Sequence, residues 1–364
     1  MHSPTQLSSR RRGPGFTTLG VGIAALLLST AVLSVAWVKR SPAPQLTHAT
    51  FPALPPFTSL EPAPALEELT DELRRKGFSE CNPHDPIGLG PYSPYDRVSL
   101  GKILIPQKGG HTKDMGYDVL VHFHGGDAVR KVLVQVTRGL VLVLVDMGTG
   151  GGPYSRAFGA PSAYPTLRRS IESALRRHCG DGRAHIRRLA LSSWSAGYVA
   201  INKIVQQKHD GYDAVVILDG LHAGYNPAKP KVPDIRNLEV AFLDSALELA
   251  RRAQRREIKL VITHSEVDPV KYPSTRLTAD LLLDRLGLSR KKLDPGSDKL
   301  AQTSSVEAGD FQLWGFGGRE EMAHCNQLRH IGRIATEVLE PAWDTPEMDR
   351  SVAPTPWPAW KKKR

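Results

Sequence analysis

The chain has 364 residues, of which 40% are hydrophobic and 23% are charged, with 32 Gly and 28 Pro. This length and apolar content suit one large domain or two ordinary ones with a buried core, and they exclude a chain that is disordered throughout. The formal net charge of +11 is concentrated at the two ends, while residues 65–360 are nearly neutral. Because no zinc-finger or RNP-like pattern accompanies the charge, we expect no nucleic-acid partner.

An apolar stretch without a charged side chain occupies residues 16–38. A helix of this length, at about 1.5 Å per residue, spans the hydrocarbon core of a bilayer, which is about 30 Å thick. The basic N-terminal segment, residues 1–15, contains three consecutive arginines. The sequence therefore predicts a single-pass transmembrane signal anchor, with a cleaved signal peptide and secretion as the alternative. Both interpretations place the rest of the protein outside the cytoplasm.

The remainder of the chain divides into a tether, a folded domain and a tail. Residues 39–64 are rich in proline, which predicts a semi-extended tether. We expect one folded domain over residues 65–345. Residues 346–364 end in Lys-Lys-Lys-Arg and are predicted to form a flexible basic tail.

Three cysteines lie far apart in the sequence, at Cys81, Cys179 and Cys325. No two of them have CxxC spacing, so the sequence supports neither a thiolate metal site nor a redox motif. One disulfide with one free thiol would suit an oxidising compartment, but the spacing does not choose the pair.

Apolar runs of strand length alternate with helix-like stretches along the expected domain. The predicted strands are residues 117–123, 140–147, 186–191, 212–218, 258–263 and 311–316. The predicted helices are residues 128–136, 162–178, 196–207 and 237–255. This alternation predicts an α/β fold, with a mostly parallel central sheet covered by helices on both faces and an antiparallel edge at residues 95–105.

The strongest chemical signal is Ser193-Trp194-Ser195-Ala196-Gly197, which stands between a predicted strand and a predicted helix. A tight strand-to-helix turn lifts the central serine out at the carboxyl end of the sheet, and it requires small residues two positions before and after. The same turn aims the N–H of Ala196 at a developing oxyanion. We expect Ser195 to be a nucleophile, with an ordinary serine-rich turn as the alternative.

A second oxyanion donor is expected after the predicted strand 117–123, which ends in His124-Gly125-Gly126-Asp127. Glycines directly after a buried strand let the backbone approach a ligand with its N–H groups turned inward. The N–H of Gly126 or of Asp127 is the candidate donor. A plain glycine turn that ends the strand is the alternative.

An acid and a histidine are expected downstream, in that order. Asp268 lies a few residues beyond a predicted strand and is the first choice for orienting an imidazole; Asp219 and Glu266 are the alternatives. After the final predicted strand, His324 lies in a loop that opens the last helix, where its ring can reach Ser195.

These pieces, in this order, resemble the α/β-hydrolase superfamily in its serine esterase and lipase-like range, over about residues 95–340. The resemblance implies Ser195 as the acyl-accepting nucleophile, His324 as general base and then acid, and Asp268 as the residue that orients the histidine. Ser193 departs from the pattern, because most members have glycine at that position. The resemblance further implies a small-molecule or lipid-like ester substrate, and it requires no cofactor and no metal.

Two other functions stay open at this point. A non-catalytic binding module at the cell surface would have the same fold without the chemistry. A metal-dependent hydrolase would use His122 and His124, which share a strand face, although no further ligand cluster accompanies them. Residues 220–234 are predicted to form a lid or substrate loop.

Overall fold

The computed structural model describes residues 81–82, 87–269, 271–298 and 301–351. All of them belong to one compact unit, Ala63–Arg364. The expected membrane segment and tether, together with residues 352–364 of the tail, lie outside the described residues. Within the described part of the chain, no helix is both long and apolar enough to cross a membrane.

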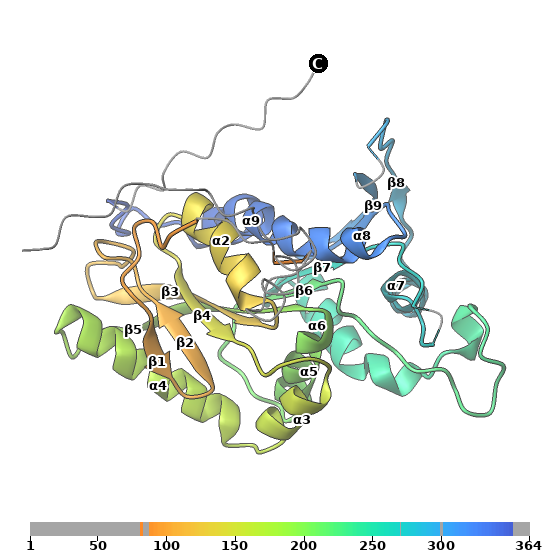
Figure 1. Ribbon diagram of the computed structural model, residues 1–364, viewed down its shortest axis with the longest axis horizontal. Coiled ribbons are helices and arrows are strands. Elements are labelled where there is room, and N and C mark those ends of the chain that lie inside the picture. The colour runs from red at the N-terminus through yellow and green to blue at the C-terminus, as the bar shows by residue number, and fades with distance from the viewer. Residues whose placement is uncertain (1–80, 83–86, 270, 299–300, 352–364) are drawn as a thin grey trace, which may run out of the picture. The chain divides into compact units, whose positions relative to one another are not determined.

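A ten-stranded sheet forms the centre of this unit, in the order β1-β2-β4-β3-β5-β6-β7-β10-β9-β8 (Figure 1). The strands are β1 (Asp96–Val98), β2 (Gly101–Leu104), β3 (Gly116–Phe123), β4 (Val141–Val145), β5 (His185–Trp194), β6 (Ala214–Leu218), β7 (Lys259–His264), β8 (Lys291–Lys292), β9 (Gln302–Ala308) and β10 (Phe311–Phe316). The six strands from β4 to β10 in this order pair in parallel, and the two strands at each edge are antiparallel. The predicted parallel sheet with an antiparallel edge near residues 95–105 is confirmed.

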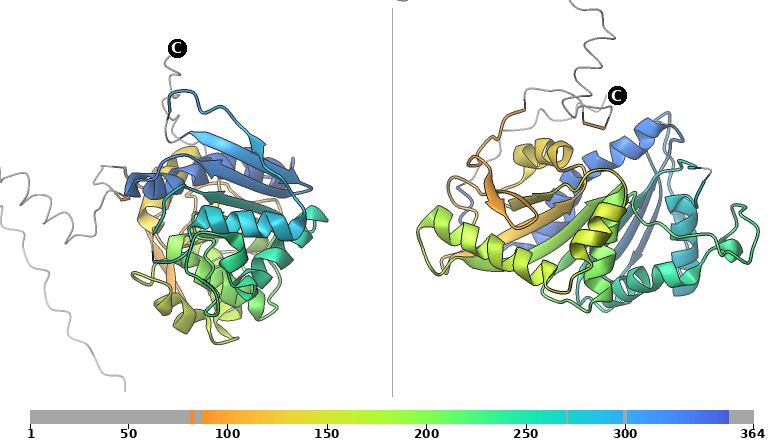
Figure 2. Two further views of the ribbon diagram at one scale, coloured as in Figure 1. Left: turned by 90° about the vertical axis from the view of Figure 1, so that its right-hand side faces the viewer. Right: turned by 60° about the horizontal axis from the view of Figure 1, so that its bottom comes forward.

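Helices cover both faces of the sheet, as Figures 1 and 2 show. They are α2 (Gly126–Val136), α3 (Gly152–Phe158), α4 (Ala163–Cys179), α5 (Tyr198–Gln206), α6 (Asp244–Gln254), α7 (Thr275–Leu286), α8 (Glu321–Asn326), α9 (His330–Ile334) and α10 (Glu340–Trp343). Short 3-10 turns η1 (Ser195–Gly197), η2 (Ile235–Asn237), η3 (Val240–Leu243) and η4 (Gln327–Arg329) and the π-helical turn η5 (Ala335–Leu339) complete the chain. Helices α2, α9 and α10 pack on one face, and α3 to α6 on the other.

The central strands are apolar on both faces because each face carries its own core. In β3, Val119, Val121 and Phe123 point into one core, while Leu120 points into the other. All four side chains are at most 1% exposed. A parallel strand that is covered on both sides reads as a continuous apolar run, which explains why the sequence located β3 and β4 so directly.

Other elements differ from the sequence-based expectations. Strand β5 extends three residues beyond its predicted end, to Trp194. The predicted helix 237–255 begins only at Asp244, because the turns η2 and η3 precede it. Strands β8 and β9 and helices α3 and α7 were not predicted. Strand β9 has the polar sequence QTSSVEA and is covered on its outer side only by the two-residue strand β8.

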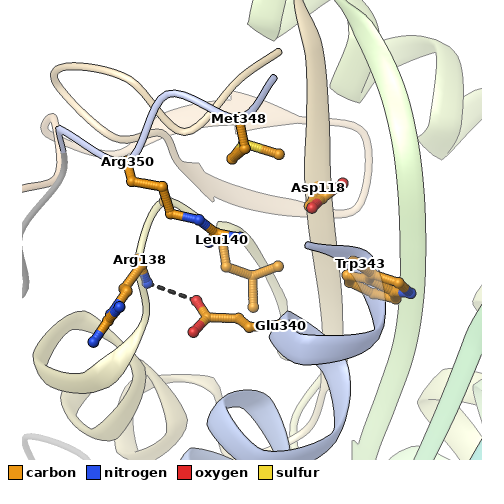
Figure 3. A pocket seen from close by; sticks show the side chains of 8 residues that line it. Asp118, Arg138, Leu140, Glu340, Trp343, Met348 and Arg350 are labelled. Atoms are coloured by element: carbon orange, nitrogen blue, oxygen red, sulfur yellow. Dashed lines mark hydrogen bonds between the residues drawn. The ribbon is translucent and has the colours of Figure 1, made fainter. Parts of the chain in front are cut away.

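The C-terminal helices close the edge of the sheet at which the parallel strands begin (Figure 3). The Arg138 N–H donates to Glu340 at 2.6 Å. Arg187 at the start of β5 donates to the Trp343 carbonyl at 2.6 Å and pairs with Asp118 at 2.5 Å. The small cavity among these residues has about 10 Å³, room for about one water. This edge of the sheet is therefore filled by the C-terminal helices.

Residues 346–351, which the sequence assigned to the flexible tail, bond to the same end of the domain. The Asp349 carbonyl accepts the Gly110 N–H at 2.8 Å, and the Asp349 N–H donates to the His111 carbonyl at 2.9 Å. Met348 is 8% exposed. The packed chain therefore extends beyond residue 345.

His330 gives the domain a testable sensitivity to acid. Its ring stacks on Phe316 with centroids 3.7 Å apart, and burial lowers the pKa of His330 to about 4. Because this pKa is below that of an unfolded histidine, the unfolded chain binds more protons, and stability is lost as the pH falls from about 6.5 toward 4. We expect His330→Phe, which keeps the stacking, to remove about 1 kcal/mol of the stability difference between pH 7 and pH 5, or about 2 °C in Tm.

Thermal unfolding of the wild type and of the variant at both pH values measures this. The same substitution at the exposed His178 is the control, and it should leave the difference unchanged. Equal pH sensitivity of the wild type and His330→Phe would contradict the expectation.

Candidate active site

Ser195 stands at a strained turn between β5 and α5. Its φ is +49°, a left-handed conformation that is uncommon for a residue with a side chain, while the preceding Trp194 is extended. A Cβ atom on Gly197 would lie 2.1 Å from the carbonyl oxygen of Phe123, so only glycine fits there. The chain therefore runs from strand to helix in the conformation that projects the Ser195 hydroxyl from the sheet edge.

Ser193, the departure from the usual glycine, is accommodated without opening the turn. The residue is fully buried opposite Phe123 of β3. Its hydroxyl is buried and has no hydrogen-bond partner within the described structure. The side chain is thus small enough for the turn and contributes no bond to it.

His324 lies in α8, after β10, and is oriented by a buried carboxylate. Its Nδ1 lies 2.7 Å from Oδ2 of Asp219, which directly follows β6. Because the carboxylate can only accept, Nδ1 carries a proton, and in the neutral tautomer of the ring the lone pair is then on Nε2. A neutral imidazole in this tautomer is prepared to take a proton through Nε2, as a general base must.

Four donors fix the Asp219 carboxylate. Oδ2 also accepts the Ser265 hydroxyl at 2.6 Å, and Oδ1 accepts the Ser265 N–H at 2.9 Å and the Thr275 hydroxyl. Burial would raise the pKa of Asp219, but the bonds from His324, Ser265 and Thr275 outweigh it and hold this pKa below its usual range. Asp219 is therefore a rigid, ionised partner for the imidazole.

This geometry corrects the first choice of acid. Asp268 is exposed in the loop after β7, and the carboxylate that bonds to the histidine is Asp219, the alternative from the neighbouring strand. The other alternative, Glu266, pairs with Arg276 at 2.9 Å. Asp219 is the partner of the histidine because hydrogen-bond donors surround it. The chain after β7 contributes Ser265, which donates to the Asp219 carboxylate, and does not contribute the carboxylate itself.

Residues next to Ser195 and Asp219 in the chain hold the serine turn, the acid and the histidine at the same edge of the sheet. The Trp194 indole N–H donates to the His324 carbonyl at 3.1 Å. A Cβ atom on Gly220 would lie 2.7 Å from the Ser195 carbonyl oxygen, so the residue after Asp219 packs directly on the serine turn. The strands β3 and β5 adjoin where the strand order reverses, which is the position of ligand sites in open α/β sheets.

The segment after β3, residues 124–127, runs into the first turn of α2 and is held by a buried histidine. It is called the oxyanion loop below because it contains the candidate oxyanion donors. Nε2 of His122 lies 2.7 Å from the His124 carbonyl, and Nδ1 lies 2.9 Å from the Ser192 hydroxyl. Since a carbonyl only accepts, Nε2–H donates and Nδ1 accepts from Ser192. Burial lowers the pKa of His122 to about 3, so the ring is neutral.

The oxyanion donors differ from the expected set. The Gly126 N–H already donates to Asp146 at 3.2 Å. The N–H groups of Asp127, in the first turn of α2, and of Ala196, in η1, lie at helix starts, where backbone donors have no intrahelical acceptor. Asp127 and Ala196 are therefore the candidate donors, and Gly126 is removed from the set because its donor is engaged.

The described residues give the metal alternative no set of ligands. Both ring nitrogens of His122 are occupied by the hydrogen bonds to Ser192 and to the His124 carbonyl. Across the described ranges, no group of three or more His, Cys, Asp or Glu residues is arranged to hold a metal ion. His122 and His124 instead shape the oxyanion loop.

Several site residues were missed by the sequence reasoning. Ser265 and Thr275 hold the acid, and His222 lies close enough to Asp219 and His324 that their charges affect it. Burial lowers the pKa of His222 to about 4, and its ring contacts Tyr272 with centroids 5.6 Å apart. The only available signal was that Ser265 and His222 each follow a predicted strand at the same sheet edge.

A disulfide ties the histidine helix to the start of the described chain. Cys81 and Cys325 are bonded across a sequence separation of 244 residues, and Cys179 is a free thiol. Cys325 directly follows His324, so the cross-link restrains the backbone that carries the imidazole.

The strand order, the parallel centre and the serine turn between β5 and α5 define a fold of the α/β-hydrolase type. No family model matches the sequence, and no curated protein matches it. Among solved structures, an ester-hydrolase from the metagenome of Lake Arreo aligns at 14% identity and a TM-score of 0.39, over 77% of this chain and 98% of that one.

Two further solved structures align at a similar level. The enterobactin esterase of Shigella flexneri aligns at 11% identity and a TM-score of 0.41, over 70% of this chain and 61% of that one. Esterase 2 of Thermogutta terrifontis aligns at 13% identity and a TM-score of 0.37, over 70% and 96% of the two chains. At these scores the alignments carry no functional argument, which rests on the residues of this chain.

Proposed function

We propose that the protein is a serine hydrolase that cleaves carboxylic esters through an acyl-enzyme on Ser195. The observation that carries this proposal is the pairing of a strained serine turn with an imidazole whose Nδ1–H donates to the buried Asp219 at 2.7 Å. A structural serine needs no left-handed conformation, and a structural histidine needs no carboxylate held by four donors.

The chemistry follows from these positions. Ser195 Oγ attacks the ester carbonyl carbon while its proton passes to Nε2 of His324, and the N–H groups of Asp127 and Ala196 stabilise the oxyanion. The C–O bond to the alcohol then breaks, and the leaving alcohol takes the proton from His324. A water molecule, deprotonated by the same imidazole, attacks the acyl group, and the acid leaves as Ser195 regains its proton.

A small-molecule or lipid-like ester is the proposed substrate, and the mechanism needs neither a metal nor an organic cofactor. A fluorophosphonate probe tests the proposal, since it reacts with an activated serine whatever the natural ester is. The probe should form one adduct, located by mass spectrometry on Ser195. A folded protein that remains unlabelled would favour the binding module instead.

We further propose that the hydrolase domain is tethered to a membrane and lies outside the cytoplasm. Two observations support this location: the uncharged apolar stretch at residues 16–38, and the Cys81–Cys325 disulfide, which is typical of oxidising compartments. Secretion is the alternative. The apolar stretch stays on the protein if it is a signal anchor and is removed if it is a signal peptide.

Protease added to intact cells should therefore digest the hydrolase domain, because the tether holds it on the outer side. The cell-associated protein should begin at or near Met1 if the stretch is an anchor, as N-terminal sequencing would show. A mature start near Trp37 would indicate a cleaved signal peptide. Protection of the domain until the cells are lysed would contradict the proposed location.

A further inference from the structure

Trp194 contacts the oxyanion loop and helix α8, the two segments that the proposed mechanism must hold in register with Ser195. Its indole N–H donates to the His324 carbonyl at 3.1 Å, and its ring lies against the His324 imidazole with centroids 4.6 Å apart. The His124 ring of the oxyanion loop stacks on the same indole, with centroids 5.1 Å apart and planes 12° from parallel.

The oxyanion loop also approaches Trp194 through its backbone. Gly125 has a φ of +77°, and a Cβ atom there would lie 3.1 Å from Cε3 of the indole and 3.0 Å from a methyl group of Leu328. Trp194 itself is only 8% exposed. The indole is thus confined between the oxyanion loop and the segment around α8.

We propose that Trp194 is a positioning residue, which sets the oxyanion loop and the general base relative to Ser195; this inference rests on the proposed serine hydrolase function. The residue is the immediate neighbour of the nucleophile, so any displacement of the serine turn moves the indole as well. A hydrogen bond to the His324 carbonyl fixes the peptide that carries the imidazole, and the stacked His124 fixes the peptide that precedes Gly125.

The same contact assists the step in which His324 holds the proton. An aromatic face attracts a cation placed over it, so the indole stabilises the imidazolium that forms when Ser195 loses its proton. This stabilisation acts in the transition state and not on the bound substrate. Loss of Trp194 should consequently reduce the rate of the chemical step rather than the affinity.

The experiment measures fluorophosphonate labelling of the full chain, because the probe requires the serine, the base and the oxyanion hole. Trp194→Phe keeps a stacking ring and removes the N–H donor; Trp194→Leu removes both. We expect kinact to fall about tenfold for Phe, which corresponds to about 1.4 kcal/mol, and about a hundredfold for Leu, with the apparent KI unchanged within twofold.

The matched control is Trp314→Phe. Trp314 is also a buried indole, at 5% exposure on β10, but its ring packs under Arg333 at 4.6 Å. The Tm of this control should fall by about as much as that of Trp194→Phe, while its kinact stays within twofold of the wild-type value. A decrease in kinact that is the same for Trp194→Phe and Trp314→Phe, or a change in KI alone, would overturn the inference.

Failure of the inference is distinguishable from failure of the proposed function. If labelling depends on Ser195 but is insensitive to both Trp194 variants, only the positioning role is wrong. If the adduct forms at another residue, the serine mechanism itself is wrong.

Discussion

Ser195→Ala should abolish ester hydrolysis and probe labelling while the protein stays folded. Removal of a triad serine costs about 10⁶ in kcat, because no other group forms the acyl intermediate. The substitution removes a hydroxyl from a half-buried position at a turn, so Tm should change by no more than a few degrees. Hydrolysis of a panel of short and long acyl esters, together with the labelling assay, measures the effect.

Ser193→Ala is the matched control, since it removes a hydroxyl two residues away that has no bond within the described structure. It should retain activity within about threefold. Ser192→Ala is a different case, because the Ser192 hydroxyl bonds to His122; we expect a partial loss rather than inactivation. A Ser195→Ala variant with most of its activity intact would eliminate the acyl-enzyme mechanism.

Asp219→Asn should lower kcat by about 10⁴, the second largest effect. The amide can donate to Nδ1 and so favours the tautomer with the proton on Nε2, which cannot accept the proton of Ser195. The matched control is Asp268→Asn, the same substitution at the exposed acid one loop further along the chain. This control should stay within about threefold of the wild type, and Glu266→Gln should be similarly mild.

The Asn side chain would also face the Ser265 and Thr275 donors, so a loss of stability is expected, and Tm must be measured beside kcat. Thr275→Val gives a second test, because it removes one donor from Asp219 and leaves the carboxylate in place. We expect an intermediate loss of kcat, of about tenfold. If Asp268→Asn is the crippling change and Asp219→Asn is nearly silent, the assignment of the acid is wrong.

The parts of the fold that could be predicted from the sequence are those determined by local pattern. Strands such as β3 and β4 are buried on both faces and read as continuous apolar runs. The serine turn needs small residues at adjacent positions in the sequence. Gly197 must be glycine because the Phe123 carbonyl approaches it closely. For these elements, the pattern that identifies the element lies within a few adjacent positions, although the contacts that it serves, such as that of Gly197 with Phe123, are distant in the sequence.

The acid could not be chosen in this way, because parallel strands all end at the same edge of the sheet. Asp219 directly after β6 and Asp268 a few residues after β7 both lie at this edge, so sequence position alone does not identify the partner of the histidine. Their difference arises from Ser265 and Thr275, which converge on Asp219 only after β7 and α7 have packed beside it. The pairing of Cys81 with Cys325 depends on the complete fold for the same reason.

The prediction of peripheral elements failed for a different reason: their pattern of apolar residues is weak or misleading. Strand β9 pairs with β10 as part of the antiparallel edge, and its polar side chains carry little period-two signal. Helix α6 was predicted too long because the apolar spacing continues through η3, a 3-10 turn with nearly the same periodicity.

The Cys81–Cys325 bond also determines how force would travel through the molecule. The polypeptide that precedes Cys81 joins the domain along two covalent paths: the main chain through residue 82, and the sulfur bridge to α8. The bridge is the shorter path to His324 by more than two hundred residues of chain. A cut in the chain anywhere between the two cysteines therefore leaves helix α8 attached to the N-terminal segment. Cys325, where the bridge attaches, and His324, the proposed point of proton transfer, are adjacent residues.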